Sequence, residues 1–187
     1  MNVIKKNTYI NKVVQSKKDV HSFGSLVSIP LTQSQNIMLG SCMEKLFADF
    51  VVSNNIQSIR KKTKKGDKET DHLYILNKQI IYCEQKNNLN LDTEKGPATR
   101  KKVQAMMEQI NKDYPEYEIK SYILASRYLS NEETIAKSII RRKYSDVNVL
   151  GVNEFLKLFD IEPIEDYDMY KKIIHEICVR KFKISSS

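Results

Sequence analysis

The chain has 187 residues, of which 41% are hydrophobic, so it is long enough for one domain with a buried core. Its three cysteines, Cys42, Cys83 and Cys178, lie far apart without CxxC spacing, which argues against a disulfide framework or a zinc site. No stretch approaches the roughly 20 apolar residues that a membrane span needs, and the N-terminal residues lack the apolar core of a signal peptide. We therefore expect a soluble, cytoplasmic protein without a membrane partner.

Helices and strands are predicted to alternate from residue 35 onward, because apolar residues recur there at helical or strand spacing. In chain order the predicted elements are a helix over 35–52, a short strand over 57–60, a hairpin over 71–88, a helix from 96, a strand over 119–126, a helix over 132–142, a strand over 147–152, a helix capped by Asn153 and a last helix over 166–182. This order predicts an α/β protein with a mixed central sheet flanked by helices, in a single domain over 1–187.

The hairpin DHLYILNKQIIYCEQKNN carries its charge at its far ends and not only in its Asn-Lys turn. Side chains alternate between the two faces of a strand, so Glu84 and Lys86 point to one side and Gln85 to the other. If the strands turn at Asn-Lys, Asp71 pairs near residue 84 and joins them. Two carboxylates and one lysine are therefore expected to converge.

Carboxylates that cluster in a partly buried place repel one another unless a cation lies between them. Magnesium prefers oxygen ligands and takes one or two protein carboxylates, which leaves its other positions for water and a substrate phosphate. We therefore expect Mg²⁺ at Asp71 and Glu84, with Lys86 beside it to orient or deprotonate an attacking water. This set of groups favours hydrolysis of a phosphodiester.

The positive charge of the chain also favours a nucleic-acid partner. The formal net charge is +8, and the basic residues cluster at 60–68, 100–102, 141–143 and 180–183. Such clusters bind polyanions well, because each neutralised phosphate releases condensed counterions. A basic run can also be no more than a solvated face, and charge by itself leaves both readings open.

The pattern formed by Asp71, twelve further residues and Glu84-Gln85-Lys86 at the end of an apolar strand resembles the PD-(D/E)XK nuclease superfamily. The continuation NNLNLDTEKGPATRKKV resembles small type II restriction endonucleases within it. Thr70 stands where the signature has a proline, a residue that is frequently missing among relatives.

This resemblance covers about residues 35–159 and implies a restriction-endonuclease-like αβββαβ core. It also implies that Asp71, Glu84 and the backbone carbonyl of Gln85 bind the metal, and that Lys86 serves the nucleophilic water. A glutamate on the preceding helix often assists in the superfamily, and Glu44 in GSCMEKLFADF matches it by position.

The function implied is a Mg²⁺-dependent type II restriction endonuclease, which hydrolyses duplex DNA at a short, palindromic sequence. A two-fold symmetric site is matched most simply by a homodimer with one active centre for each strand. The residues expected to contact DNA are Arg60, Lys61, Lys62, Lys64, Lys65, Asn87, Asn88, Thr99, Arg100 and Lys101.

Two other functions stay open on this scaffold. A Holliday-junction resolvase is also small, basic and dimeric, although the roughly 60 residues beyond Ser126 exceed what a minimal resolvase core needs. A non-catalytic DNA-binding module is disfavoured because Asp71, Glu84 and Lys86 are all present.

Each candidate residue also has an ordinary structural explanation. Asp71 could be a turn residue that starts a strand, and Glu84 with Lys86 could be an exposed ion pair. Glu44 could be a helix-surface charge. His72 lies next to Asp71, but strand alternation points it away from the site, so we expect it to be structural.

Overall fold

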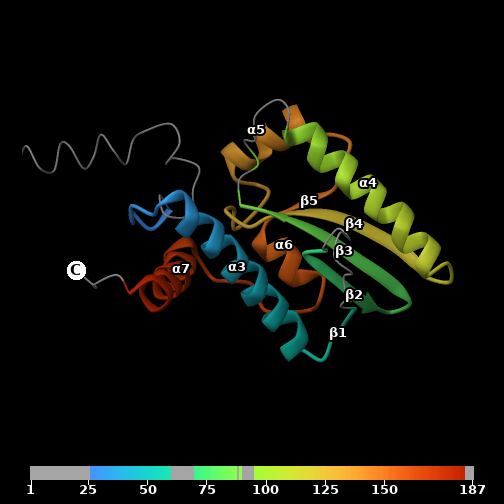
Figure 1. The fold of residues 1–187 in the computed structure, drawn as a ribbon, viewed down its shortest axis with the longest axis horizontal. Helices are drawn as coiled ribbons and strands as arrows, with labels where there is room; N and C mark the ends of the chain where they lie inside the picture. Colours follow the sequence, from blue (N-terminus) through green and yellow to red (C-terminus); the bar gives the residue numbers. More distant parts are fainter. Residues whose placement is uncertain (1–25, 60–69, 88, 90–94, 184–187) are drawn as a thin grey trace, which may run out of the picture. The chain divides into compact units, whose positions relative to one another are not determined.

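A computed structural model describes residues 26–59, 70–87, 89 and 95–183, and its fold is drawn in Figure 1. The chain forms two compact units, one made of Met1–Met43 with Glu165–Ser187 and the other of Glu44–Ile164. The expectation of a single domain stays a prediction.

The larger unit is built on a five-stranded mixed sheet with the strand order β1-β2-β3-β4-β5. The strands are β1 (Gln57–Ser58), β2 (His72–Leu76), β3 (Gln79–Lys86), β4 (Glu118–Ala125) and β5 (Val149–Leu150). The pairs β1–β2 and β2–β3 are antiparallel, whereas β3–β4 and β4–β5 are parallel. The predicted α/β class with a mixed sheet is therefore confirmed.

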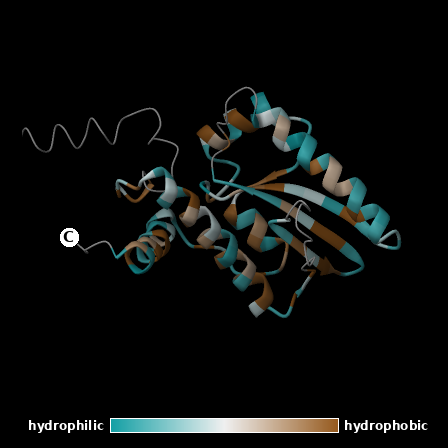
Figure 2. Cartoon of the chain, viewed as in Figure 1, coloured by the Kyte–Doolittle hydropathy of each residue, from teal (hydrophilic) through white to brown (hydrophobic). Residues whose placement is uncertain are grey.

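The helices follow one another along the chain in the order that the sequence predicts. They are α3 (Gln33–Ser53), α4 (Lys95–Asp113), α5 (Thr134–Lys143), α6 (Val152–Lys157) and α7 (Tyr167–Phe182). Figure 2 shows hydrophobic residues in the strands and hydrophilic residues on much of α4. Among the residues described, no helix is long and apolar enough to cross a membrane.

The β2–β3 hairpin turns at Asn77 and Lys78, as predicted. Both residues have left-handed φ angles, 49° and 62°, and a two-residue turn of this kind matches the natural twist of the paired strands. The register pairs His72 with Cys83. If this register is continued by one residue, Asp71 lies opposite Glu84.

The sheet has a different helical cover on each face (Figure 1). Helices α4 and α5 share one buried cluster with alternate strand residues, among them Leu73, Ile80, Tyr82, Val103, Met106, Ile110, Ile123 and Ile139. On the opposite face, the ring centroids of His72 and Phe155 of α6 lie 5.5 Å apart, and those of Tyr74 and Phe159 lie 5.2 Å apart. Because residues two apart share a face, Glu84 continues the α4 side of β3.

The region around β5 and α6 differs from prediction. The strand expected over 147–152 is limited to two residues, and α6 begins with Gly151 as its N-cap in place of Asn153. The Asn153 side chain instead donates to the carbonyl of Ile164 at 3.0 Å and accepts from its N–H at 2.9 Å. Asparagine is a good cap because it bonds nearby backbone groups, and here the same property ties α6 to a more distant segment.

The smaller unit contains the N-terminal part of α3 and all of α7. Asp166 caps α7, since its Oδ1 accepts a hydrogen bond from the Met169 N–H at 2.7 Å. The buried residues of α7 are Tyr170, Ile174 and Cys178. Tyr167 and Ile177, whose spacing predicts an inward orientation, are only partly buried.

Candidate active site

Glu84 is a fully buried carboxylate near the carboxyl end of β3. The Tyr82 hydroxyl donates to its Oε2 at 3.1 Å, and the ammonium of Lys86 lies 2.6 Å from its Oε1. All three residues lie on one face of β3, because they are two positions apart. The structure thus brings Glu84 and Lys86 together as the sequence predicts.

A second lysine, which sequence reasoning missed, also binds Glu84. The ammonium of Lys102, from α4, lies 2.7 Å from both oxygens of the Glu84 carboxylate. The helical spacing of α4 could have indicated Lys102. Thr99, Val103 and Met106 are buried along this helix, and Lys102 lies three residues after Thr99 and four before Met106. That spacing places Lys102 at the edge of the inward stripe.

Asp71 lies just before β2 and is held against β3. Its Oδ2 accepts a hydrogen bond from the backbone N–H of Gln85 at 2.7 Å. Burial and the neighbouring charge of Glu84 raise the pKa of Asp71 to about 6, although Lys102, this hydrogen bond and Lys86 act in the opposite direction. Asp71 is therefore harder to ionise than an ordinary aspartate.

Glu44 of α3 belongs to the same electrostatic cluster. Burial, with a further contribution from the charge of Asp71, raises its pKa to about 7, and Lys86 and Lys102 partly oppose these effects. Glu44 thus matches the assisting glutamate of the superfamily by its position in the sequence, and it also lies near the acidic side chains of Asp71 and Glu84. Its catalytic role stays a prediction.

Glu84 behaves differently from the other two acidic residues. Burial alone would raise its pKa, but Lys86 and Lys102 together lower it below the ordinary value. Glu84 is therefore ionised and neutralised by lysines, whereas Asp71 and Glu44 lack comparable counter-ions. We refer to Glu44, Asp71, Glu84, Lys86 and Lys102 as the carboxylate–lysine cluster.

The cluster suits a hard divalent cation by the kind of its donor atoms. Its carboxylates offer oxygen ligands, and the raised pKa values of Asp71 and Glu44 show that additional positive charge would be favourable there. Within the described residues, no group of three or more His, Cys, Asp or Glu side chains could hold a metal ion by itself. A magnesium ion here would therefore need water or a substrate phosphate to complete its ligands.

Gln85 and His72 face away from this cluster. The His72 Nε2 lies 2.8 Å from Oε1 of Gln85, and the His72 Nδ1 lies 3.0 Å from the hydroxyl of Tyr74. Burial lowers the pKa of His72, so its ring is neutral and joins two buried polar partners. The predicted orientation of His72 is confirmed, and metal binding by the Gln85 carbonyl stays a prediction.

The residues expected to contact DNA have diverse surroundings. Asn87 accepts a hydrogen bond from the Ser126 hydroxyl at 3.3 Å, Thr99 is buried, and Lys101 is exposed. Arg100 is paired with both oxygens of Asp146, at 2.8 and 2.9 Å. The other residues expected to contact DNA lie outside the described part of the chain: Arg60, Lys61, Lys62, Lys64, Lys65 and Asn88.

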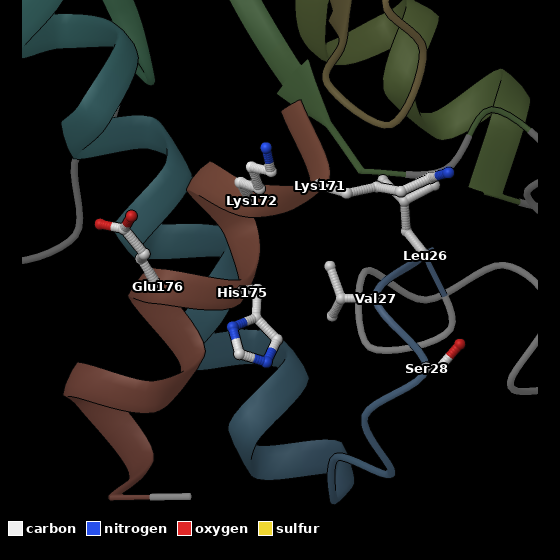
Figure 3. Close-up of a pocket in the computed structure, with 7 residues that line it drawn as sticks. All are labelled: Leu26, Val27, Ser28, Lys171, Lys172, His175 and Glu176. Atoms are coloured by element: carbon white, nitrogen blue, oxygen red, sulfur yellow. The ribbon is translucent and has the colours of Figure 1, made fainter. Parts of the chain in front are cut away.

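The linings of two surface hollows include no residue of the cluster. One, of about 490 Å³, is lined by Leu26, Val27, Ser28, Lys171, Lys172, His175 and Glu176, and Figure 3 shows His175 and Val27 on facing sides of it. The other, of about 650 Å³, is lined by Glu132 and residues of α5. Neither lining contains buried carboxylates like those of the cluster. The carboxylate–lysine cluster is therefore the better candidate for an active site.

Comparison of the chain with protein-family models, with curated proteins and with solved structures finds no match. The function is therefore inferred from the side chains of the carboxylate–lysine cluster. Three acidic residues and two lysines converge there from α3, the β2–β3 hairpin and α4.

Proposed function

We propose that this protein is a Mg²⁺-dependent endonuclease that hydrolyses phosphodiester bonds of duplex DNA, with the fold and site of the PD-(D/E)XK superfamily. The proposal rests mainly on one observation: Asp71, Glu84 and Lys86 come together at the open end of the β2–β3 hairpin. An exposed ion pair would not require a fully buried Glu84 or a second, partly buried carboxyl group beside it.

In this proposal Asp71 and Glu84 hold the divalent cation. The bound cation would neutralise charge on the phosphate and favour ionisation of a water molecule. Asp71 is suited to this role because its carboxyl group is fixed by the Gln85 N–H and is short of counter-ions. Glu44 lies close enough to Asp71 for the charge of Asp71 to raise its pKa, and it would assist from the helix side.

Lys86 is proposed to orient the attacking water as an ammonium, or to accept the water's proton after its own ammonium has released one to solvent. Its ammonium contacts Glu84 directly, and its side chain is 27% exposed, so it borders both the buried carboxylate and the solvent. A lysine at this boundary can reach a water molecule beside the phosphate without being a ligand of the cation itself. Positioned acid–base groups typically contribute about 10²- to 10⁴-fold to a rate.

Duplex DNA is the proposed substrate because the chain is basic and one of its basic runs adjoins the acidic cluster. The net charge is +8, and the basic run 100–102 lies on α4, the helix that also supplies Lys102 to Glu84. Basic groups near an acidic cation site favour a phosphate backbone, because they neutralise its charge and release counterions. Cleavage at a short palindromic sequence by a homodimer, as in type II restriction endonucleases, is the specific form that we propose.

The proposal can be tested with three substrates, each incubated with and without Mg²⁺: supercoiled plasmid, linear phage DNA and a synthetic four-way junction. Reproducible, discrete fragments of phage DNA that appear only with Mg²⁺ are the expected result. Cutting of the junction alone would indicate a resolvase instead. A gel shift without cutting of any substrate would indicate a DNA-binding module and would overturn the proposed catalysis.

A further inference from the structure

Lys102 occupies an unusual place relative to Glu84. Its ammonium is equidistant from the two carboxylate oxygens, at 2.7 Å from each, whereas the contact of Lys86 at 2.6 Å is made to Oε1. Glu84 is fully buried, and the Lys102 side chain is 31% exposed. The partly exposed Lys102 therefore places its charge between the two oxygens of a buried carboxylate.

This central position is also where a cation bound through both oxygens of Glu84 would lie. A divalent cation and an ammonium cannot share such a position, because like charges at that separation repel strongly. If Glu84 takes up a divalent cation through both oxygens, Lys102 has to move.

Lys102 is better placed to move than Lys86. Lys86 lies on the same strand as Glu84, two residues away, and is paired through the strand backbone with Ala125 of β4. Lys102 reaches the carboxylate from a separate helix and contacts both oxygens, whereas Lys86 contacts Oε1; the two side chains are similarly exposed, at 31% and 27%. The Lys102 ammonium would stay close to the cation and to any phosphate bound there, because α4 itself need not shift.

We propose that Lys102 is the counter-ion of Glu84 in the cation-free protein, that a divalent cation displaces it, and that the displaced ammonium then contacts the reacting phosphate. This inference rests on the proposed function for its second part, the contact with phosphate. Its first part, the competition between Lys102 and a divalent cation, concerns binding alone. An ordinary structural ion pair would show neither behaviour.

The test compares Lys102→Gln with Lys112→Gln, which removes the same charge from an exposed position of α4. First, affinity for Mn²⁺ is measured by calorimetry without DNA. Lys102→Gln should bind Mn²⁺ about tenfold more tightly than the wild type, since close charge pairs couple by amounts of this order or more. Lys112→Gln should bind like the wild type. Unchanged or weaker binding by Lys102→Gln, or no Mn²⁺ binding by the wild type, would overturn the competition.

Second, single-turnover cleavage is measured at saturating Mg²⁺. Lys102→Gln should cut about 10²- to 10³-fold more slowly, the usual loss when one group that stabilises transition-state charge is removed. Tighter cation binding with slower cleavage is an outcome that a purely structural ion pair would not produce. Wild-type rates in Lys102→Gln would overturn the phosphate contact while leaving the proposed nuclease function intact.

A third variant separates loss of charge from loss of folding. Lys102→Arg keeps the positive charge next to Glu84, so it should retain Mn²⁺ affinity within about threefold of the wild type and keep part of the cleavage. If Lys102→Gln does not fold, Lys102→Met takes its place, because it removes the charge and keeps an unbranched side chain; it should bind Mn²⁺ about tenfold more tightly, and unchanged affinity would overturn the competition. A wild type that binds Mn²⁺ but cuts no DNA would refute the proposed function, whereas the affinity comparison would still decide the competition.

Discussion

The backbone N–H of Gln85 donates a 2.7 Å hydrogen bond to the carboxylate of Asp71. This bond joins the residue that precedes β2 to the residue between Glu84 and Lys86 on β3, and so it fixes the Asp71 carboxylate at the side of the buried Glu84. The side chain of Gln85 points the other way, to His72. The hairpin end is therefore held from both faces of the sheet.

Replacing His72 should destabilise the fold. His72→Ala removes a buried ring that contacts Gln85, Tyr74 and Phe155. Because it leaves a cavity and removes the hydrogen bond to the buried Gln85 side chain, the free energy of unfolding should fall by about 2–4 kcal/mol in urea denaturation. His175→Ala, at an exposed position, is the matched control and should change it by less than about 0.5 kcal/mol. Equal stabilities of the two variants would contradict the structural role of His72.

The stability of the cation-free protein should carry a pH dependence that originates at Glu44. The folded pKa of Glu44 is about 7, above its ordinary value of 4.5. Folding therefore favours the protonated form, and this contribution to stability is present below about pH 4 and lost as the pH rises through 7. Glu44→Gln keeps a neutral side chain at every pH, so it should lose less stability between pH 5 and 8 than the wild type.

The measurement for Glu44 is thermal denaturation in EDTA at a series of pH values. At pH 8 the Tm of Glu44→Gln should exceed that of the wild type by about 2 °C, and the two should converge near pH 5. Comparing the two proteins at each pH removes the contributions of groups that do not interact with Glu44, such as His72. Asp71 interacts with Glu44 and has a pKa of about 6, so Glu44→Gln in the Asp71→Asn background isolates the contribution of Glu44. A constant difference between pH 5 and 8 would show that Glu44 titrates normally.

Lys86 should be required for cleavage and dispensable for binding. Lys86→Ala should reduce single-turnover cleavage by about 10²- to 10⁴-fold, as expected for loss of a positioned acid–base group, and should keep DNA binding supported by Ca²⁺. Lys86→Arg should restore little activity, because a guanidinium is bulkier and does not readily release a proton. Cleavage by Lys86→Ala at the native rate would show that the Lys86–Glu84 contact is only a structural ion pair.

The basic segment 60–65 is predicted to bind the DNA backbone irrespective of sequence. Reversal of charge at Lys61, Lys62 and Lys64 should weaken binding to specific and unrelated duplexes alike. The slope of log affinity against log salt should fall in magnitude by about 0.9 for each phosphate that the variant no longer neutralises. Fluorescence anisotropy between low and moderate salt measures this slope, and an unchanged slope would identify the segment as a solvated run.

Much of the fold could be predicted because its main elements have strong local patterns. The hairpin was recognisable from two apolar strands around an Asn-Lys turn, and α4 from its inward stripe of Val103, Met106 and Ile110. The limits of α6 were not, because Asn153 forms its hydrogen bonds with Ile164 and not with the helix start. Cap preferences describe how a side chain bonds to the nearest backbone groups. Here Asn153 bonds instead to a residue eleven positions away, which local preferences do not predict.

The grouping of the site residues divides in the same way. Strand alternation places Glu84 and Lys86 on one side, and hairpin register brings Asp71 near them, so these three could be grouped from sequence. The contribution of Lys102 depends on how α4 packs against β3, which no local pattern specifies. The neutral, inward-facing His72 was correctly separated from the site by alternation alone.

The most direct test of the proposed active site is single-turnover cleavage of DNA by the wild type, Asp71→Asn and Glu84→Gln at fixed Mg²⁺. Both substitutions keep the shape of the side chain and remove one carboxylate from the proposed cation site, so cleavage should fall by about 10³-fold or more. Glu116→Gln, which changes an exposed glutamate, should cut like the wild type. We expect discrete fragments from the wild type and Glu116→Gln only. Cleavage at the wild-type rate by Asp71→Asn or Glu84→Gln, with all proteins folded, would contradict the proposed active site.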